Sequence, residues 1–185
     1  MNTNRGERLS RYAHPQRNQL FPDVLDDFND VAQRAPEKVI AQAMAAAFRA
    51  DENTPFAPIV ANLFRHSDAE LRAALVNILV SHLGHETNRV LSNAGLFGFD
   101  PESKQVTEGT TTQLSPEAIG VVAAEAEHRD SRIVDEVSAL YARHTRVVSK
   151  LGAHAVATVM TDIAQRASRD LDLWLTIQSD SVGGV

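Results

Sequence analysis

Two segments of the chain repeat the same pattern of apolar and polar positions. The sequence PEKVIAQAMAAAFRAD begins at Pro36, and PEAIGVVAAEAEHRDS begins at Pro116. Each starts with Pro-Glu, continues through alanine-rich apolar positions and ends on an arginine before a polar turn. The likeness extends into FAPIVANLF from Phe56 and IVDEVSALY from Ile133. An internal repeat of this kind indicates a duplicated helical unit.

Apolar residues in the first repeat follow the helical period of about 3.6 residues. A preceding helix is predicted to begin at Pro22, and the first helix of the repeat at Pro36. The next helix begins after Thr54, a residue suited to an N-cap. The third follows a capping box, in which Ser67 and Glu70 satisfy each other's exposed backbone N–H groups. The pattern therefore predicts three helices in this unit.

The second repeat is predicted to have the same three helices. Its first helix begins at Pro116 after a serine N-cap, and its second is capped by Asp130 or Ser131. Thr145 is predicted to cap the third helix, at the position of Ser67 in the first repeat. Apolar residues at helical spacing extend this third helix to Ala167. The unit is therefore predicted to match the first in helix order and in its caps.

These patterns predict an all-α fold, a helical bundle built from two similar three-helix units plus an N-terminal helix. The expected segments are a disordered N-terminal arm (1–20), a first helical unit (21–84), a linker or mobile loop (85–114), a second helical unit (115–178) and a disordered tail (179–185). The linker is polar, with room for a short helix around Val90 and Leu91. Its apolar residues Leu96, Phe97 and Phe99 are expected to dock on a neighbouring helix.

Residues 171–177 fit two patterns. They alternate in polarity as a strand does, and they also extend the apolar stripe of the preceding helix. We favour a helix, because a lone strand would leave its backbone groups unpaired. A strand would imply pairing with a second chain. In either case the apolar side chains here are candidates for an interaction surface: Leu171, Leu173, Trp174, Leu175 and Ile177.

Composition and net charge limit the classes of function that the chain can have. The chain has 185 residues, of which 43% are hydrophobic and only 5% aromatic, so its core is built mainly from small aliphatic side chains. The net charge of −6 disfavours a nucleic-acid protein, apart from a weak contact of the basic stretch between Arg5 and Arg17. No apolar run approaches the about 18 residues of a membrane span or forms a secretion signal. A cytoplasmic location is expected.

The candidate functional residues are three histidines and one glutamate that could bind a metal ion. The chain has no cysteine, and it lacks the phosphate-loop, dinucleotide, nucleophile-elbow and zinc-protease motifs. His82, His85, Glu86 and His128 are the candidate metal ligands. A metal site competes with a simpler interpretation, in which histidines near helix ends interact with free carbonyl groups and the helix dipole. No cofactor is predicted.

The repeated segments PEKVIAQAMAAAFRADENTPFAPIVANLF and LSPEAIGVVAAEAEHRDSRIVDEVSALYARH, with a following Leu-Gly-Ala, resemble a group of small bacterial all-helical proteins of unknown function. The resemblance covers residues 30–165 and implies no activity; this chain departs from it in its polar linker and its charged C-terminal region. We expect a non-enzymatic helical interaction or scaffold protein that self-associates or binds a protein partner. The alternative is a metal-binding helical protein, or a metal-dependent enzyme that uses a histidine and carboxylate cluster.

Overall fold

The computed structural model describes residues 5–13, 22–50, 55–95, 106–112 and 114–178, without the side chains of residues 5–8, 110, 171, 174, 176 and 178. Every regular element in these ranges is helical, which confirms the predicted all-α class. The elements are α1 (Arg5–Ala13), α2 (Val24–Ala32), α3 (Glu37–Ala50), α4 (Phe56–His66), α5 (Ala69–Ser81), η1 (Gly84–Glu86), α6 (Thr87–Asn93), α7 (Glu108–Thr111), α8 (Pro116–Arg129), α9 (Ile133–Ala142), α10 (Thr145–Val148), η2 (Ser149–Leu151), α11 (Ala153–Ala167) and α12 (Leu171–Gln178).

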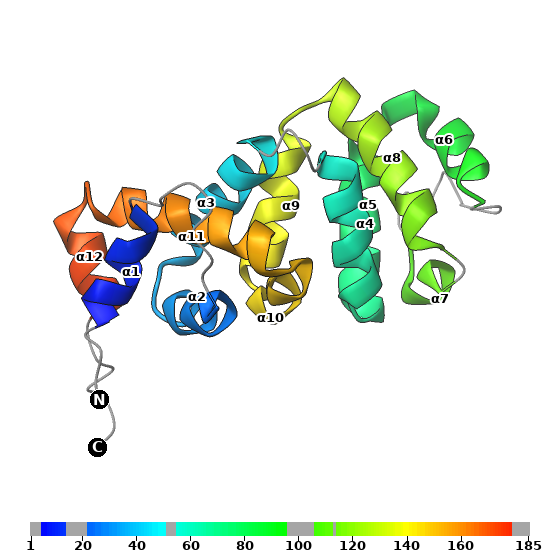
Figure 1. Ribbon diagram of the computed structural model, residues 1–185. Helices are drawn as coiled ribbons and strands as arrows, with labels where there is room; N and C mark the ends of the chain where they lie inside the picture. The colour runs from blue at the N-terminus through cyan, green and yellow to red at the C-terminus, as the bar shows by residue number, and fades with distance from the viewer. Residues whose placement is uncertain (1–4, 14–21, 51–54, 96–105, 113, 179–185) are drawn as a thin grey trace, which may run out of the picture.

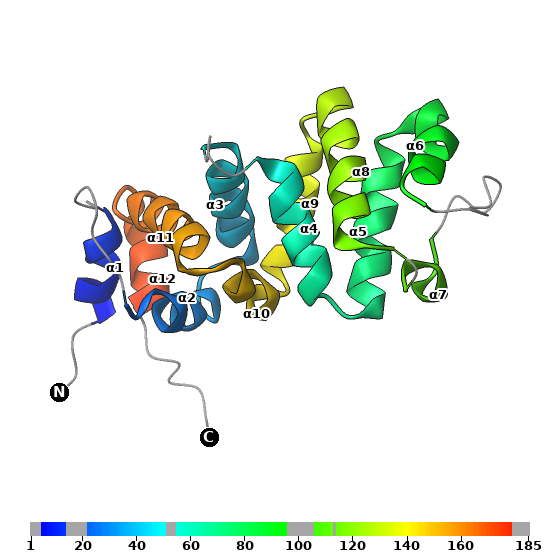
Figure 2. The same ribbon diagram turned by 45° about the vertical axis from the view of Figure 1, so that its right-hand side comes forward.

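The helices form an elongated body rather than one parallel bundle (Figure 1). Helices α1, α2, α11 and α12 lie at one end, and α6 and α7 lie at the other (Figures 1 and 2). Between them, α3 packs mainly against α9, and α4 packs mainly against α8. The centre of the fold therefore pairs helices that lie far apart in the sequence.

The N-terminal arm predicted for residues 1–20 is a helix between Arg5 and Ala13, so that prediction is wrong over this range. Leu9 and Tyr12, three positions apart, are buried at 2% and 1% exposure. The hydroxyl of Tyr12 donates to Asp27 of α2 over 2.8 Å. A short helix of this length is marginal by itself. Its packing against α11 supplies the tertiary contact that sequence periodicity did not show.

The start of α5 differs from the predicted capping box. Asp68, rather than Ser67, caps this helix, and its carboxylate accepts the Leu71 N–H over 2.9 Å. Ser67 is buried, and its hydroxyl bonds both the Leu63 carbonyl and the Tyr141 hydroxyl, each over 2.8 Å. The serine therefore joins α4 to α9 instead of capping α5.

The second repeat also departs from the expected pattern. The predicted N-cap of α8 is confirmed, because the Ala118 N–H donates to the Ser115 hydroxyl over 3.1 Å. The single helix predicted from Thr145 to Ala167 is instead divided into α10, η2 and α11. Gly152 separates them with a φ of 100°, a conformation that favours glycine. Thr145 is the first residue of α10 and does not cap it.

The predicted linker contains ordered elements. The short helix expected around Val90 and Leu91 is α6, and both side chains are buried. Asn77 of α5 holds the segment before α7, since its side chain accepts the Val106 N–H over 2.7 Å and donates to the Val106 carbonyl over 3.1 Å. The predicted docking residues Leu96, Phe97 and Phe99 lie outside the described residues, as does Thr54.

Residues 171–177 are helical, as favoured from the sequence, but they form a separate helix rather than an extension of α11. The chain turns at Ser168–Asp170, and the Asp170 carboxylate then accepts the Leu173 N–H over 3.1 Å at the start of α12. None of the described helices combines the length and the apolar character that crossing a membrane requires.

Candidate functional site

His82 lies between two carboxylates at the end of α5. Its Nδ1 is 3.2 Å from Asp130, which follows α8, and its Nε2 is 3.1 Å from Glu136 of α9. The imidazole is only 9% exposed. Helix α5 ends at Ser81, so the His82 side chain projects from the C-cap position towards the turn between α8 and α9. One side chain therefore connects three helices.

Asp130 is held in its ionised form by its neighbours. The side chain of Arg132 donates to both carboxylate oxygens, and the Arg132 backbone N–H donates to Oδ1 over 3.0 Å. These bonds, together with the bond to His82, lower the pKa of Asp130 well below its ordinary value. Asp130 is therefore a stable anion beside the imidazole.

The ionic contacts continue over the surface of the neighbouring helices. Arg49 of α3 donates to both carboxylate oxygens of Asp135, over 2.9 and 2.6 Å. Within α8, Arg129 pairs with Glu125, and at the start of α6 Arg89 pairs with Glu86. We call this set of contacts, together with those of His82, the ionic corner. The contacts within it that cross between elements join α3 to α9 and the end of α5 to Asp130 and α9.

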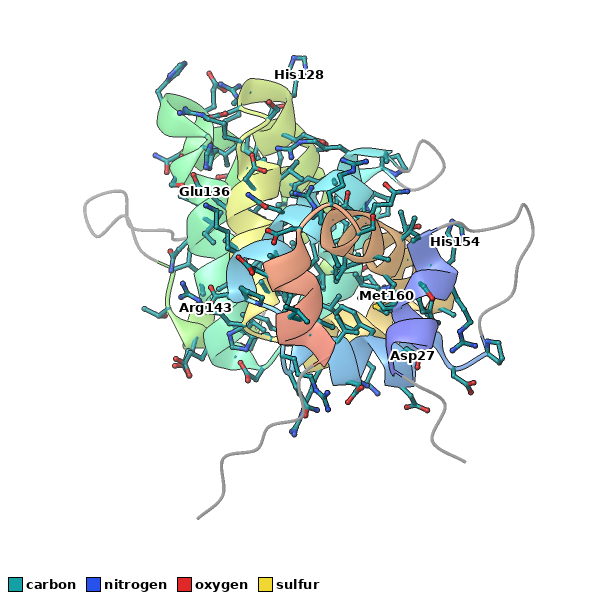
Figure 3. All side chains as sticks on the ribbon, turned by 90° about the vertical axis from the view of Figure 1, so that its left-hand side faces the viewer. Asp27, His128, Glu136, Arg143, His154 and Met160 are labelled. Atoms are coloured by element: carbon teal, nitrogen blue, oxygen red, sulfur yellow. The ribbon has the colours of Figure 1, made fainter. Side chains whose placement is uncertain are left out.

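The four candidate metal ligands do not converge. His82 contacts Asp130 and Glu136 rather than Glu86, which contacts Arg89 and, over 3.5 Å, the exposed His85. His128 is exposed, and its ring extends beyond the helices at the edge of the molecule (Figure 3). The predicted helical spacing of His82 and Glu86 fails because Gly84, with a φ of 58°, turns the chain between them.

A metal ion also fits poorly at His82 itself. Its two carboxylates lie at different ring nitrogens, on opposite edges of the imidazole, so they do not face a common point. Across the residues that the structure describes, no three histidine or acidic side chains gather in a way that would hold a metal ion. The two contacts instead link the end of α5 to Asp130 after α8 and to Glu136 of α9.

A second polar cluster lies at the other end of the molecule, under α1. Asp27 is 4% exposed and accepts hydrogen bonds from Tyr12 over 2.8 Å and Arg11 over 3.3 Å. Burial, and then the bond to Asp27, raises the pKa of the Tyr12 hydroxyl above its ordinary value. Asp27 points towards α1 (Figure 3). These contacts attach α1 to α2, and we assign them a structural role.

The predicted interaction residues of α12 separate into two groups. Leu173 and Ile177 are buried at 8% and 4%, so they belong to the core. Leu175 is 56% exposed and lies on the opposite face of the helix. The side chains of Leu171 and Trp174 are outside the described part of the chain. Of the candidates whose side chains are described, Leu175 is therefore the one available to a partner.

Local sequence patterns indicated His82 but not its partners. Asp130 appeared only as a helix cap, and Glu136 had no distinguishing pattern. Their approach to His82 depends on the packing of α5 against α8 and α9, which lie far away in the sequence. Searches of protein families, curated proteins and solved structures found no match to this chain.

Proposed function

We propose that the protein is a non-enzymatic helical interaction protein that associates with a second copy of itself through the outer face of α12. The exposure of Leu175 carries this proposal. The sequence of α12, LDLWLTIQ, is mostly apolar, and Leu173 with Ile177 already fills the face that packs on the core. Leu175 is directed to the opposite face, where more than half of its surface is exposed to water.

A second copy is the partner that suits this surface. The helix lies at an end of the elongated body, where two chains can approach without other helices intervening (Figure 1). In a twofold dimer each chain presents the same patch, so an apolar helix face is its own complement. Burying Leu175 against its copy removes apolar area from water on both chains. The association would make the protein a connecting or scaffold element.

The test compares two exposed apolar residues. Leu175→Glu places a charge on the α12 face, whereas Val121→Glu does the same on α8, where Val121 is 61% exposed. Helix α8 lies on the far side of α3 and α9 from α12 (Figures 1 and 2). Light scattering after size-exclusion chromatography should show twice the 20.2 kDa chain mass for the native protein and for Val121→Glu.

In Leu175→Glu the main species should have the mass of one chain, with an unchanged helical circular dichroism spectrum. A native protein that remains a single chain at tens of micromolar would refute the proposal. An equal loss of association in both variants would also refute it, because the effect would then come from added charge and not from the α12 face.

A further inference from the structure

The helices of each sequence repeat pack more extensively against the other repeat than against one another. We call residues 24–81, which contain α2 to α5, the first half, and residues 116–167, which contain α8 to α11, the second half. The two most extensive helix contacts of the molecule, α4 with α8 and α3 with α9, both cross between halves. By comparison, α3 touches α4 only slightly, and α8 touches α9 only slightly.

Ion pairs across the halves follow a reciprocal pattern. Glu37, in the first Pro-Glu sequence, accepts from Arg143 at the end of α9 over 2.7 Å. Glu117, in the second Pro-Glu sequence, accepts from Arg65 near the end of α4 over 3.1 Å. The start of α3 thus lies beside the end of α9, and the start of α8 lies beside the end of α4. The arrangement is the one that two copies of a single unit would form.

The apolar contact between the halves is close. A Cβ atom at Gly120 of α8 would lie 3.5 Å from the Ala61 Cβ of α4 and 3.4 Å from the Ala57 carbonyl oxygen. The core residues of α4 and α8, among them Leu63, Phe64, Ile119 and Val122, are almost fully buried. A half without its complement would expose this surface, so each half requires another half to bury it.

We propose that the first half of one chain can pack against the second half of another chain, so that two chains exchange halves and form an intertwined dimer. The exchanged dimer keeps the contacts of α4 with α8 and of α3 with α9, now between two chains. The helices within each half keep the arrangement that they have in a single chain. The proposal goes beyond the contact through α12, because it uses buried residues of α3, α4, α8 and α9 and does not involve Leu175.

Cysteine chemistry provides a specific test, since the native chain has no cysteine. The 3.5 Å separation at Ala61 and Gly120 lies within the Cβ–Cβ range of disulfides, about 3.5–4.5 Å. Ala61→Cys and Gly120→Cys are made in separate full-length chains that carry different tags, and the two chains are co-expressed. Oxidation with diamide should give a reducible species that carries both tags, with the mass of two chains.

The controls separate exchange from chance collision. Ala61→Cys with Val121→Cys places the second thiol on the exposed outer face of α8, one residue away. This pair should give far less of the two-tag species. The double variant Ala61→Cys/Gly120→Cys should close its bridge within one chain, which verifies the geometry. If the two-tag species forms no better with Gly120→Cys than with Val121→Cys, the proposal is wrong.

A second pair of cysteine substitutions tests exchange without altering the close contact at Gly120. Glu37→Cys and Arg143→Cys lie at exposed positions and join α3 to α9, where a short bismaleimide can link them. Exchange predicts a two-tag product from this pair as well, and its absence would overturn the proposal. Repeating either experiment with Leu175→Glu chains distinguishes the two modes of association. In that variant the main species is a single chain, and exchange should persist as a minor two-tag species that the covalent link captures.

Discussion

The two helix pairs at the centre of the fold are held together in different ways. In both pairs the helices run antiparallel, because the start of each Pro-Glu helix lies beside the end of its partner. The α4–α8 pair approaches closely at Gly120. The α3–α9 pair has ion pairs at both ends, Glu37 with Arg143 and Arg49 with Asp135. One interface should therefore be sensitive to side-chain size and the other to charge.

The comparison of the two helix pairs also shows which features the two repeats share and which features differ between them. The position of the Pro-Glu start, the alanine-rich stripe and the contact with the opposite half occur in both pairs. Glycine at the closest approach occurs only in α8, because the position that matches Gly120 in the repeat is Ile40, which is buried. Similar helix placement is thus achieved with different packing residues.

The largest effect is expected from enlarging Gly120. Gly120→Leu would force side-chain atoms beyond Cβ into the backbone of α4, and overpacking of this kind costs about 1–3 kcal/mol. Gly120→Ala should have the opposite sign. Its Cβ would make ordinary contacts at 3.4–3.5 Å, and alanine in a helix interior gains about 0.5–1 kcal/mol over glycine. Urea denaturation of both variants measures the change in the free energy of unfolding.

Stabilisation by Gly120→Leu would show that α4 and α8 are separated by a space that a side chain can fill. Destabilisation by Gly120→Ala would show that the pair is tighter than the 3.4 Å contact indicates. Either result would remove the contrast in packing between the two helix pairs.

A smaller effect is expected from removing charge in the α3–α9 pair. Arg49→Met keeps most of the aliphatic side chain but loses the paired hydrogen bonds to Asp135. Both groups are partly exposed, so the expected loss is about 0.2–1 kcal/mol. Arg65→Met is the matched variant in the α4–α8 pair, where the ion pair is more exposed and joined by a single bond. Its loss should be smaller.

Salt provides the check on this second prediction. The difference between native protein and Arg49→Met should shrink in about 1 M NaCl, where charge interactions are screened over about 3 Å. Equal losses for Arg49→Met and Arg65→Met, unaffected by salt, would contradict an ionic contribution specific to α3 and α9.

Sequence periodicity predicted the helices where local patterns are strong. The Ser115-Pro116 start and the apolar stripe of α8 are local features, so they were confirmed. The capping role of Ser67 was wrong because its hydroxyl bonds Tyr141, which is distant in the sequence, while the adjacent Asp68 caps the helix. The helix of residues 5–13 was missed because its stability depends on packing against α11. Tertiary contacts decided the outcomes for Ser67 and for residues 5–13.

The candidate site was less predictable than the fold. The sequence placed His82 near a helix end, where it lies, but its partners Asp130 and Glu136 come from a turn and a helix in the other half. Predicting them requires knowing that α5 packs against α8 and α9. In α12 the sequence identified an apolar segment, yet it could not assign Leu173 to the core and Leu175 to the surface. That division depends on the turn at Asp170, which sets the orientation of the helix.

The smallest effect concerns Glu127 of α8, which lies near Arg49 and so joins the two helix pairs electrostatically. Burial raises the pKa of Glu127, and the attraction of Arg49 offsets this only in part. A carboxyl whose folded pKa exceeds its unfolded value contributes stability at low pH. That contribution is lost as pH rises through the folded pKa. At neutral pH the charged form is therefore slightly unfavourable in the folded protein.

Glu127→Gln removes this charge, so the variant should be more stable than the native protein at pH 7, by no more than about 0.5 kcal/mol. The advantage should disappear below the ordinary glutamate pKa of about 4.3, where the native side chain is protonated in both states. Melting temperatures measured across this range test the sign. Glu125→Gln is the control on the same helix. It loses the ion pair with Arg129 and should gain no stability as pH rises. A Glu127→Gln variant less stable than native at pH 7 would mean that the attraction between Glu127 and Arg49 outweighs the cost of burying the carboxylate.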